Sequence, residues 1–252
     1  MSTTAKPGDY LQPDWPAPSN IVAWVSCRQG GVSAPPYASL NPATHVGDEP
    51  ANVQRNRQII SQQCRLPSAP VWLNQTHSTD IIELTPSAPE HVDADGAISS
   101  ALNRVCVVQT ADCLPVLICD QAGTQVAAIH AGWRGLVAGI LERAVARMQA
   151  QPQQLLVWLG PAISAQYFEV GAEVRQQFVA LKVRNQNAFT ASHRPQHYMA
   201  DLYQLARNQL QSVGVAAIYG GQYCSYADER RFYSYRRDGV TGRMASLIYR
   251  KA

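Results

Sequence analysis

The feature that most constrains the fold is a succession of short apolar runs in the middle of the chain. Runs of this length, rich in Val, Ile and Leu, are typical of strands buried on both faces of a sheet, and they are far too short to cross a membrane. The clearest examples are 105–109, 114–119, 126–130 and 155–159. The sequence therefore predicts a buried sheet at the centre of the molecule.

Helical patterns flank these runs. Residues 136–148 place apolar side chains at i, i+3 and i+4, which indicates a helix with one face against the core. Further helices are expected at 51–64, 174–181 and 202–213, and further strands at 21–25, 71–73, 81–84 and 215–219. Because strands and helices alternate without a strict βαβ repeat, we expect an α/β (α+β) fold with mixed β-sheets and flanking helices.

Length and composition indicate one domain. The chain has 252 residues, of which 46% are apolar and 15% are charged. A chain of this length can bury roughly 70–75% of the surface that its unfolded form exposes. The sequence contains no internal repeat. We expect residues 1–20, which are rich in proline, to be irregular and residues 21–252 to form a single domain.

Charge and the N-terminal residues narrow the choice of partners and compartment. A net charge of +3 is too small to favour nucleic acid or a membrane as the main partner. The first 20 residues carry one lysine, four prolines and no apolar stretch, so we expect no signal peptide and a cytoplasmic protein with reduced thiols. We expect a monomer or a small homo-oligomer.

One segment, residues 230–237, interleaves arginines with aromatic residues, as single-strand nucleic-acid binders do. The same pattern is also compatible with a salt-bridged surface or a phosphate clamp. We expect this segment to build the fold and the rim of a pocket and not to bind nucleic acid. Tyr233 and Tyr235 are expected on one face of a strand.

Three apolar segments each end in a side chain that can bind a metal: His77, Cys113 and His130. Two imidazoles and a thiolate are typical of catalytic zinc, which keeps a fourth position for water or substrate. A lone His or Cys at a strand end is more often packed or solvated, and the separations of 36 and 17 residues match no short zinc motif. The pattern allows a shared metal or a Cys113 nucleophile with a histidine base.

Residues near His130 and upstream of it add further candidates. Arg134 follows His130 just before an expected helix, and a helix N-terminus together with an arginine is suited to an anion. We therefore take Arg134 as a candidate substrate-binding residue. Asp93 and Asp95 could form a carboxylate pair, although Asp95 followed by glycine also fits a plain turn.

Nine sequence blocks carry a resemblance to a known family. The most specific are TADCLPV at 110–116 and HAGWRG at 130–135. The others are GVSAPPYASLN-ATHVGD (31–48), NR (56–57), QTH (75–77), DADGAIS (93–99), GPAISAQYFEVG (160–171), DLYQLARNQL (201–210) and FYSYRRDGVTGR (232–243). Together they resemble the YfiH-like proteins, also called the multicopper polyphenol oxidase or laccase-domain family.

The resemblance implies a fold and a set of site residues. It implies that residues 21–252 form one YfiH-like catalytic domain, similar to the catalytic domain of the cytotoxic necrotizing factor. The three metal-capable residues above match the family's zinc ligands and catalytic centre. His45 matches a further catalytic residue, and Asn41 and Arg57 match substrate-binding residues, with Arg57 placed to contact phosphate. Asn41-Pro42-Ala43 departs from the usual Asn-Leu-Gly of the family.

The activity implied is zinc-dependent phosphorolysis of the purine nucleosides adenosine, inosine and S-methyl-5′-thioadenosine, with adenosine deamination as a second reaction. The expected partners are a small-molecule nucleoside and phosphate. Two alternatives stay open: a Cys–His hydrolase that edits peptidoglycan precursors, and a copper-dependent polyphenol oxidase with copper at the same ligands. Six histidines without an HxH pair disfavour a multicopper centre. A purely structural protein is disfavoured because structural zinc usually has four protein ligands.

Overall fold

A computed structural model describes residues 10–85 and 92–252. Its strands are β1 (Tyr10–Leu11), β2 (Ile21–Ser26), β3 (Ile81–Glu83), β4 (Gly96–Ser99), β5 (Cys106–Thr110), β6 (Leu114–Asp120), β7 (Val126–Ala131), β8 (Leu155–Leu159), β9 (Glu169–Gly171), β10 (Phe189–Ala191), β11 (His197–Ala200), β12 (Ala217–Gly220) and β13 (Met244–Arg250). Its helices are α1 (Pro50–Gln63), α2 (Trp133–Val137), α3 (Ile140–Arg147), α4 (Ala172–Leu181), α5 (Leu202–Ser212) and α6 (Tyr235–Asp238), with the 3-10 helices η1 (Pro152–Gln154) and η2 (Val183–Ala188).

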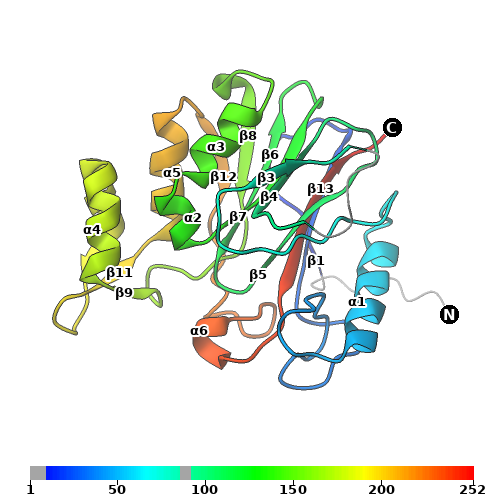
Figure 1. The fold of residues 1–252 in the computed structure, drawn as a ribbon, viewed down its shortest axis with the longest axis horizontal. Coiled ribbons are helices and arrows are strands. Elements are labelled where there is room, and N and C mark those ends of the chain that lie inside the picture. Colours follow the sequence, from blue (N-terminus) through cyan, green and yellow to red (C-terminus); the bar gives the residue numbers. More distant parts are fainter. Residues whose placement is uncertain (1–9, 86–91) are drawn as a thin grey trace.

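Two sheets pack face to face, and helices cover their outer faces (Figure 1). The six-stranded sheet has the order β12-β8-β6-β7-β4-β3, and the four-stranded sheet has the order β1-β2-β13-β5. Helices α2, α3 and α5 pack on the six-stranded sheet, and α1 packs on the other side of the four-stranded sheet. The six-stranded sheet pairs strands in both directions. The expectation of an α/β fold with mixed sheets and flanking helices is therefore confirmed.

Side-chain alternation along the central strands explains these layers. In β6, Val116 and Ile118 pack among the helices, whereas Leu117 and Cys119 pack between the two sheets. The strand is apolar on both faces because both faces are covered. Trp158 of β8 is fully buried between the sheets. Large apolar side chains buried in this way contribute about 1.5–3 kcal/mol each to stability.

The register of β6 and β7 decides which residues meet at one end of the sheet. The two strands are antiparallel, and Leu114 and Pro115 pair with Ala131 and His130. The turn that precedes β6 therefore lies beside the end of β7. This pairing brings Cys113 to His130, although a β-hairpin loop and two strands separate them along the chain.

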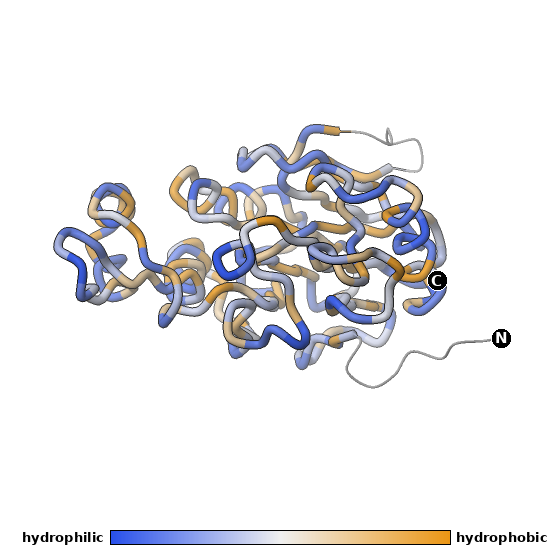
Figure 2. The backbone as a smooth tube through the Cα atoms, turned by 90° about the horizontal axis from the view of Figure 1, so that it is seen from below, coloured by the Kyte–Doolittle hydropathy of each residue, from blue (hydrophilic) through white to orange (hydrophobic). Residues whose placement is uncertain are grey.

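A small lobe extends from the side of the two packed sheets, at the left of Figures 1 and 2. It consists of α4, η2 and the three-stranded sheet β10-β11-β9. Phe178 and Phe189 anchor it with rings 5.9 Å apart. Phe168, just before β9, lies where the lobe joins the main body and lines the cavity described below.

Two expected elements differ from the structure. The single helix at 136–148 is wrong, because Gly139 has a φ of 84° and separates α2 from α3. A left-handed φ ends a regular helix, and glycine adopts it without steric cost. The strand at 71–73 is also wrong. The side-chain amide of Gln75 accepts from the Gln109 N–H at 2.7 Å and donates to its carbonyl at 2.8 Å, so a side chain ties this segment to β5.

The C-terminal basic segment also differs from its expected form. Tyr235 begins α6, whose N-cap is Ser234, so Tyr233 and Tyr235 do not share a strand face. Tyr233 is fully buried, whereas Tyr235 is 62% exposed. Strands β1, β4, β9, β10, β11 and β13 were not expected from the sequence, and β1 pairs with β2 although residues 1–20 were expected to be irregular. Within residues 10–85 and 92–252, no helix combines the length and the apolar character needed to span a membrane.

Candidate active site

His77, Cys113 and His130 lie together at one end of the six-stranded sheet. The atoms that they offer as metal ligands are all within 4.8 Å of one another. Sγ of Cys113 is 3.8 Å from Nε2 of His77, and the two imidazole rings lie edge to face with centroids 4.8 Å apart. The three residues that the sequence singled out therefore form one cluster.

Each of the three residues is held by a different kind of backbone. His130 lies within β7, and Cys113 lies in the turn between β5 and β6. His77 lies in a loop with a φ of 60°, an uncommon conformation for a residue with a side chain. The sequence predicted that all three residues end strands. In the structure, one lies in a strand and two lie in loops, and the loop residues depend on side-chain contacts for their position.

Asp95 provides most of those contacts. Its carboxylate accepts backbone N–H groups from Thr76, His77 and Ser78 at 3.1, 3.1 and 2.6 Å, and the Ser78 hydroxyl at 2.8 Å. Its Oδ1 also lies 2.7 Å from Nδ1 of His130. One buried carboxylate thus holds the loop of one histidine and the ring of the other. The sequence indicated Asp95 only as a turn or as half of a carboxylate pair.

The ionisation of the cluster follows from these contacts. Burial raises the pKa of the Cys113 thiol, but the charge and hydrogen bond of His130 outweigh burial and lower it. Burial lowers the pKa of His130, but the charges of Cys113 and Asp95 outweigh burial and raise it. Burial also opposes ionisation of Asp95, yet its hydrogen bonds to His130 and Ser78 lower its pKa to about 2. Without a metal, the groups favour a thiolate beside an imidazolium.

These donors fit a metal ion of the zinc type. Asp95 occupies Nδ1 of His130 and leaves Nε2 to face the cluster, the carboxylate–histidine arrangement that supports many metal ligands. Tetrahedral zinc holds N and S ligand atoms roughly 3.5 Å apart, close to the 3.8 Å between Cys113 and His77. The cluster can therefore hold a metal with three protein ligands and leave one position open.

Gly132 makes room for the cluster. A Cβ at this position would lie 3.0 Å from the His77 ring and 3.1 Å from Sγ of Cys113. Contacts this short force the neighbouring side chains to shift by a few tenths of an ångström. A residue larger than glycine would therefore displace two of the three ligands.

The three residues of the cluster line a cavity of about 440 Å³. Its apolar wall is formed by Trp133, Ile163, Phe168 and Tyr235, and three arginines, Arg134, Arg236 and Arg243, also line it. Pockets of this size, with a mostly apolar wall and a few polar groups, are typical of small-molecule sites. The arginines favour a ligand that carries negative charge.

Two further lining residues have unused hydrogen-bonding atoms. Gln109 and Thr110, at the end of β5, are 4% and 2% exposed. Among the described residues, Gln109 Oε1 and Thr110 Oγ1 are buried without a hydrogen-bond partner. The sequence analysis missed both residues, although they stand directly before Ala111, Asp112 and Cys113.

The four other sequence-predicted residues divide into two pairs. His45 and Arg134 line the cavity. Asn41 and Arg57 do not line it but lie behind the wall. Asn41 is fully buried, accepts the backbone N–H of Arg243 at 3.1 Å and donates to Asp48 at 2.9 Å.

Arg57 supports the same wall from α1. Its Nε donates to the carbonyl of Pro42 at 2.8 Å, and its guanidinium lies 4.3 Å from the centre of the Trp72 ring. Burial lowers the pKa of Arg57 to about 10. Burial also lowers the pKa of His45, with smaller contributions from the charges of Arg243 and Arg57. His45 is therefore neutral at neutral pH.

A family model described as multi-copper polyphenol oxidoreductase laccase matches residues 22–251. The chain belongs to this laccase-domain family. A Shigella flexneri member named purine nucleoside phosphorylase YfiH is 50% identical over 242 residues, covering 95% of this chain and 98% of that protein. A Pseudomonas aeruginosa protein, also named a purine nucleoside phosphorylase, is 48% identical over 240 residues, covering 95% and 98%.

Solved structures agree with this assignment. The laccase-domain chain superimposes on a crystal structure from Neisseria meningitidis with a TM-score of 0.93 at 47% identity, covering 97% of this chain and 100% of the other. YlmD from Geobacillus stearothermophilus gives a TM-score of 0.88 at 28% identity, covering 99% and 98%. The expected membership of the YfiH-like, laccase-domain family is confirmed.

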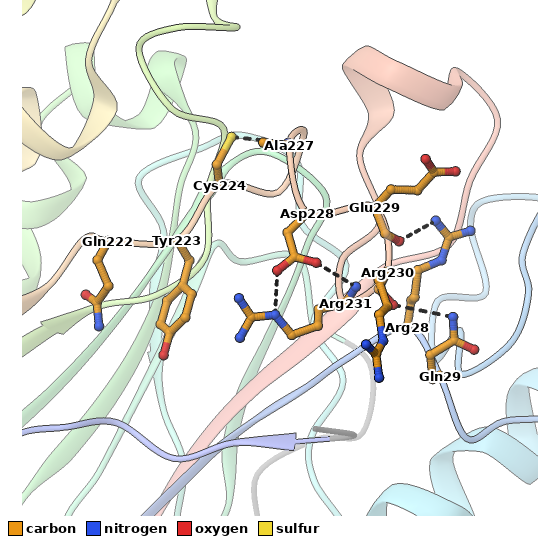
Figure 3. Close-up of a pocket in the computed structure, with 10 residues that line it drawn as sticks. All are labelled: Arg28, Gln29, Gln222, Tyr223, Cys224, Ala227, Asp228, Glu229, Arg230 and Arg231. Carbon is orange, nitrogen blue, oxygen red and sulfur yellow. Dashed lines mark hydrogen bonds and ion pairs between the residues drawn. The ribbon is translucent and has the colours of Figure 1, made fainter. Parts of the chain in front are cut away.

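The laccase-domain chain has a second, more open hollow of about 880 Å³. Figure 3 shows that Arg231 pairs with Asp228 at 2.5 Å and that Arg28 donates to the backbone carbonyl of Glu229 at 3.1 Å. The His–Cys–His cluster is not among its lining residues. We assign the active site to the smaller cavity.

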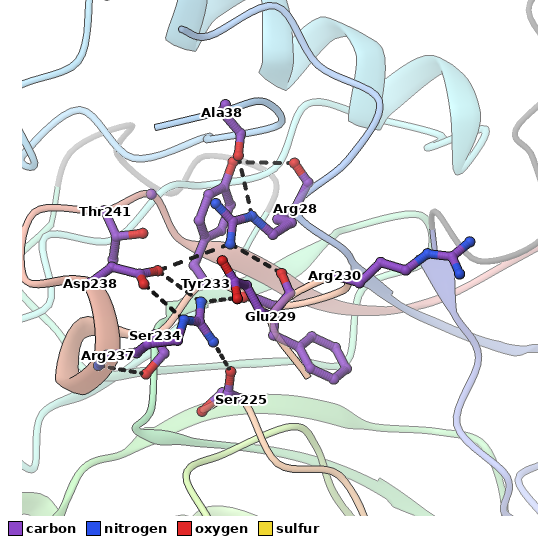
Figure 4. A network of polar contacts seen from close by, with 12 residues as sticks. Arg28, Ala38, Ser225, Glu229, Arg230, Tyr233, Ser234, Arg237, Asp238 and Thr241 are labelled. Atoms are coloured by element: carbon purple, nitrogen blue, oxygen red, sulfur yellow. Dashed lines mark hydrogen bonds and ion pairs between the residues drawn. The ribbon is translucent and has the colours of Figure 1, made fainter. Parts of the chain in front are cut away.

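The adjacent residues Arg236 and Arg237 of the basic segment have different positions. Arg237 points into the protein and donates to the carbonyls of Ser225, Tyr226 and Phe232 at 2.9, 2.8 and 3.1 Å (Figure 4). It also pairs with Asp238 at 2.7 Å. Arg236 lines the cavity. The segment is therefore held by one arginine and presents the other to the site.

Proposed function

We propose that this laccase-domain protein is a zinc-dependent purine nucleoside phosphorylase. The observation that carries the proposal is the His77–Cys113–His130 cluster in the lining of a cavity that also has aromatic residues and three arginines. The names of relatives at 50% and 48% identity support it. The substrates are phosphate and adenosine, inosine or S-methyl-5′-thioadenosine, and the products are the free base and a ribose 1-phosphate.

The residues of the cavity suit the two substrates in different ways. Trp133 and Tyr235 offer aromatic surface on which a purine can stack. Gln109 and Thr110 offer hydrogen-bonding groups with no partner among the described residues. The arginines provide positive charge for the phosphate. Holding both substrates in contact accelerates the reaction because it removes most of the entropy cost of bringing them together.

When bound, zinc would supply Lewis-acid polarisation to a group in its fourth position. Asp95 fixes the ring of His130 and the loop of His77, so that the protein presents these ligands with one defined geometry. Deamination of adenosine to inosine is the second activity that we propose for this cavity. Both reactions place the purine nucleoside beside the cluster.

A thiol hydrolase that edits peptidoglycan precursors is the second candidate. The observation that favours it is the sequence of contacts from Cys113 to His130 to Asp95, with a lowered thiol pKa, which is typical of cysteine nucleophiles. The two proposals exclude each other when metal is bound, because a thiolate that binds a metal is not free to attack. Multicopper oxidases need several copper sites, and the described residues contain one such cluster, so we do not propose that activity.

The decisive experiment combines metal analysis with product analysis. Protein purified without chelator should contain about one zinc per chain, and Cys113→Ala should lose the metal and the activity. Incubation with adenosine should release adenine only when phosphate is present, whereas inosine should form with or without phosphate. Adenine release that does not depend on phosphate would contradict phosphorolysis, and a metal-free protein with full activity would favour the thiol hydrolase.

A further inference from the structure

Arg243 forms no ion pair with a carboxylate among the described residues, in contrast to Arg231 and Arg237. It is partly buried and lines the cavity. Its Nη1 donates to the backbone carbonyls of Thr241 and Gly242, both at 3.0 Å. Among the described residues, its Nε and Nη2 groups have no hydrogen-bond partner. Two backbone carbonyl groups thus hold one end of the Arg243 guanidinium group. Its remaining N–H donors are available to a ligand in the cavity.

The neighbours of Arg243 increase the positive charge in this part of the cavity. The charges of Arg243 and Arg57 both act on His45, which lines the same wall. Arg57 is also partly buried, and its guanidinium contacts a backbone carbonyl and an aromatic ring but no carboxylate among the described residues. Two partly buried guanidinium groups therefore act on one imidazole, and neither forms an ion pair with a carboxylate among the described residues.

Buried charge without a partner is costly, and proteins usually place an opposite charge or a ligand beside it. Burial lowers the pKa of both Arg243 and Arg57, but neither guanidinium gives up its proton at neutral pH. The nearby Cys113 and Asp112 carry negative charge, yet Cys113 belongs to the ligand cluster and Asp112 binds Ser225 and the Arg236 N–H. An anionic ligand is the remaining way to neutralise this region.

We propose that Arg243 and His45 form the anion subsite of the cavity and bind the phosphate that attacks the nucleoside. This inference rests on the proposed function. Arg57 acts from behind as a positioning residue. A phosphate oxygen forms the new bond to C1′ while the bond from C1′ to the purine nitrogen breaks. The electron pair leaves with the purine, which takes up a proton that dihydrogen phosphate can supply.

The other two arginines of the cavity are less suited to this role. Arg236 donates to two backbone carbonyls from one Nη group, as Arg243 does, but it is exposed, so solvent screens its charge more than that of the partly buried Arg243. Arg134 is exposed, and its guanidinium lies over the ring of Trp133 at 4.5 Å. The sequence pointed to Arg134 and Arg57 for the anion, whereas the geometry points to Arg243, which lines the cavity and is partly buried.

Binding of inorganic phosphate by the metal-loaded protein tests the proposal without requiring turnover. Isothermal titration should show that Arg243→Met weakens phosphate binding by ~10-fold or more, the effect of losing hydrogen bonds to a charged group. Arg243→Lys keeps the positive charge but loses the planar guanidinium group. Its affinity for phosphate should lie between that of Arg243→Met and that of the unmodified protein. Arg230→Met, which removes an exposed charge outside the cavity, is the matched control and should bind phosphate like the unmodified protein.

Kinetics add a second readout. Arg243→Met should raise the KM for phosphate by a similar factor and leave the KM for the nucleoside within about twofold. Wild-type-like phosphate binding by Arg243→Met, or loss of binding in Arg134→Met instead, would overturn the proposal. If phosphate binds through Arg243 but no nucleoside is cleaved, the proposed function fails and the anion subsite stands.

Discussion

Asp95 and Asp112 are both buried beside the ligand cluster, but they hold different kinds of partner. Asp95 binds the imidazole of His130 and the consecutive N–H groups of residues 76–78. Asp112 accepts the hydroxyl of Ser225 at 2.6 Å and the N–H of Arg236 at 2.7 Å. Two buried carboxylates therefore have different structural roles. One orients metal ligands, and the other joins segments of the cavity wall.

The sequence positions of the partners explain this division. The His130 ring is 35 residues from Asp95, which directly precedes β4, the strand that pairs with β7. Ser225 and Arg236 are 113 and 124 residues from Asp112. Asp112 itself has a φ of 85°, so the turn before Cys113 depends on these distant contacts. The comparison teaches that the chemistry of the site is built locally, whereas the shape of its cavity is built across the chain.

The largest effect is expected from Asp95→Asn. The amide keeps the shape but places N–H donors where the carboxylate accepts them, and it removes the charge that holds His130. We expect metal affinity to fall ~10–100-fold and the free energy of unfolding to fall by about 3 kcal/mol. Competition with a chelator and denaturant unfolding measure the two quantities. Asp93→Asn, at an exposed carboxylate two residues away, should change neither by a comparable amount.

Asp112→Asn should have a different profile. We expect metal content to stay at the wild-type level, because Asp112 touches none of the three ligands through its side chain. The KM for the nucleoside should rise several-fold as Tyr235 and Arg236 lose their anchor, and the free energy of unfolding should fall by about 1–3 kcal/mol. Equal metal loss in this variant and in Asp95→Asn would remove the distinction between the two aspartates.

Thiol reactivity in chelator-treated protein sharpens the comparison further. Cys113 should react with iodoacetamide at neutral pH, because His130 stabilises its thiolate. Asp95→Asn should slow this reaction several-fold, since a less stabilised imidazolium lets the thiol pKa return toward its ordinary value. Asp112→Asn should leave the rate unchanged. Cys106 and Cys119, in which burial raises the thiol pKa to about 12, serve as unlabelled internal controls in mass spectra.

The smallest effects are expected from substitution of two serines. Here the partner of Asp112 should matter more for stability than the partner of Asp95. Ser225→Ala leaves one oxygen of Asp112 without its hydroxyl donor and should cost about 1–3 kcal/mol. Ser78→Ala removes one of several donors to Asp95 and should cost about 0.5–1 kcal/mol. Chemical denaturation of both variants under the same conditions gives the difference. A larger loss of stability for Ser78→Ala would mean that the other donors to Asp95 do not compensate for the missing hydroxyl group.

The central sheet was predictable because its signal is local. The runs at β6, β7 and β8 are apolar on both faces, and the structure covers both faces. The break at Gly139 was not predictable from periodicity, because apolar spacing continues across the glycine and only its left-handed φ separates the helices. The segment before His77 resembled a strand because Val71 and Leu73 are buried. In the structure, the side chain of Gln75 forms hydrogen bonds to the neighbouring strand β5 in place of backbone hydrogen bonds.

The site was predictable to a different degree. Metal-capable residue types pointed to His77, Cys113 and His130, and the structure brings them together. The sequence indicated Asp95 only as a turn or as half of a carboxylate pair, because its contacts to residues 76–78 and His130 form only in the folded chain. Arg243 was missed because nothing in the neighbouring sequence marks its place in the cavity lining. The assigned roles of His45, Asn41, Arg57 and Arg134 stay predictions. The placement of Arg57 behind the cavity wall shows why composition alone does not distinguish a ligand contact from a support.

Strand β13 lies between β2 and β5 in the four-stranded sheet, although it comes last in the order of elements. During synthesis on the ribosome, the edges of β2 and β5 that pair with β13 therefore stay without a hydrogen-bonded partner strand until residues 244–250 emerge. Unpaired edges invite association with other chains, and pairing over such a long sequence separation is slow. Arg243, which directly precedes β13, is delivered to the cavity by the same event. A nascent chain thus acquires the part of the cavity wall that contains Arg243 in a single late step, and we expect it to be most exposed to aggregation just before that step.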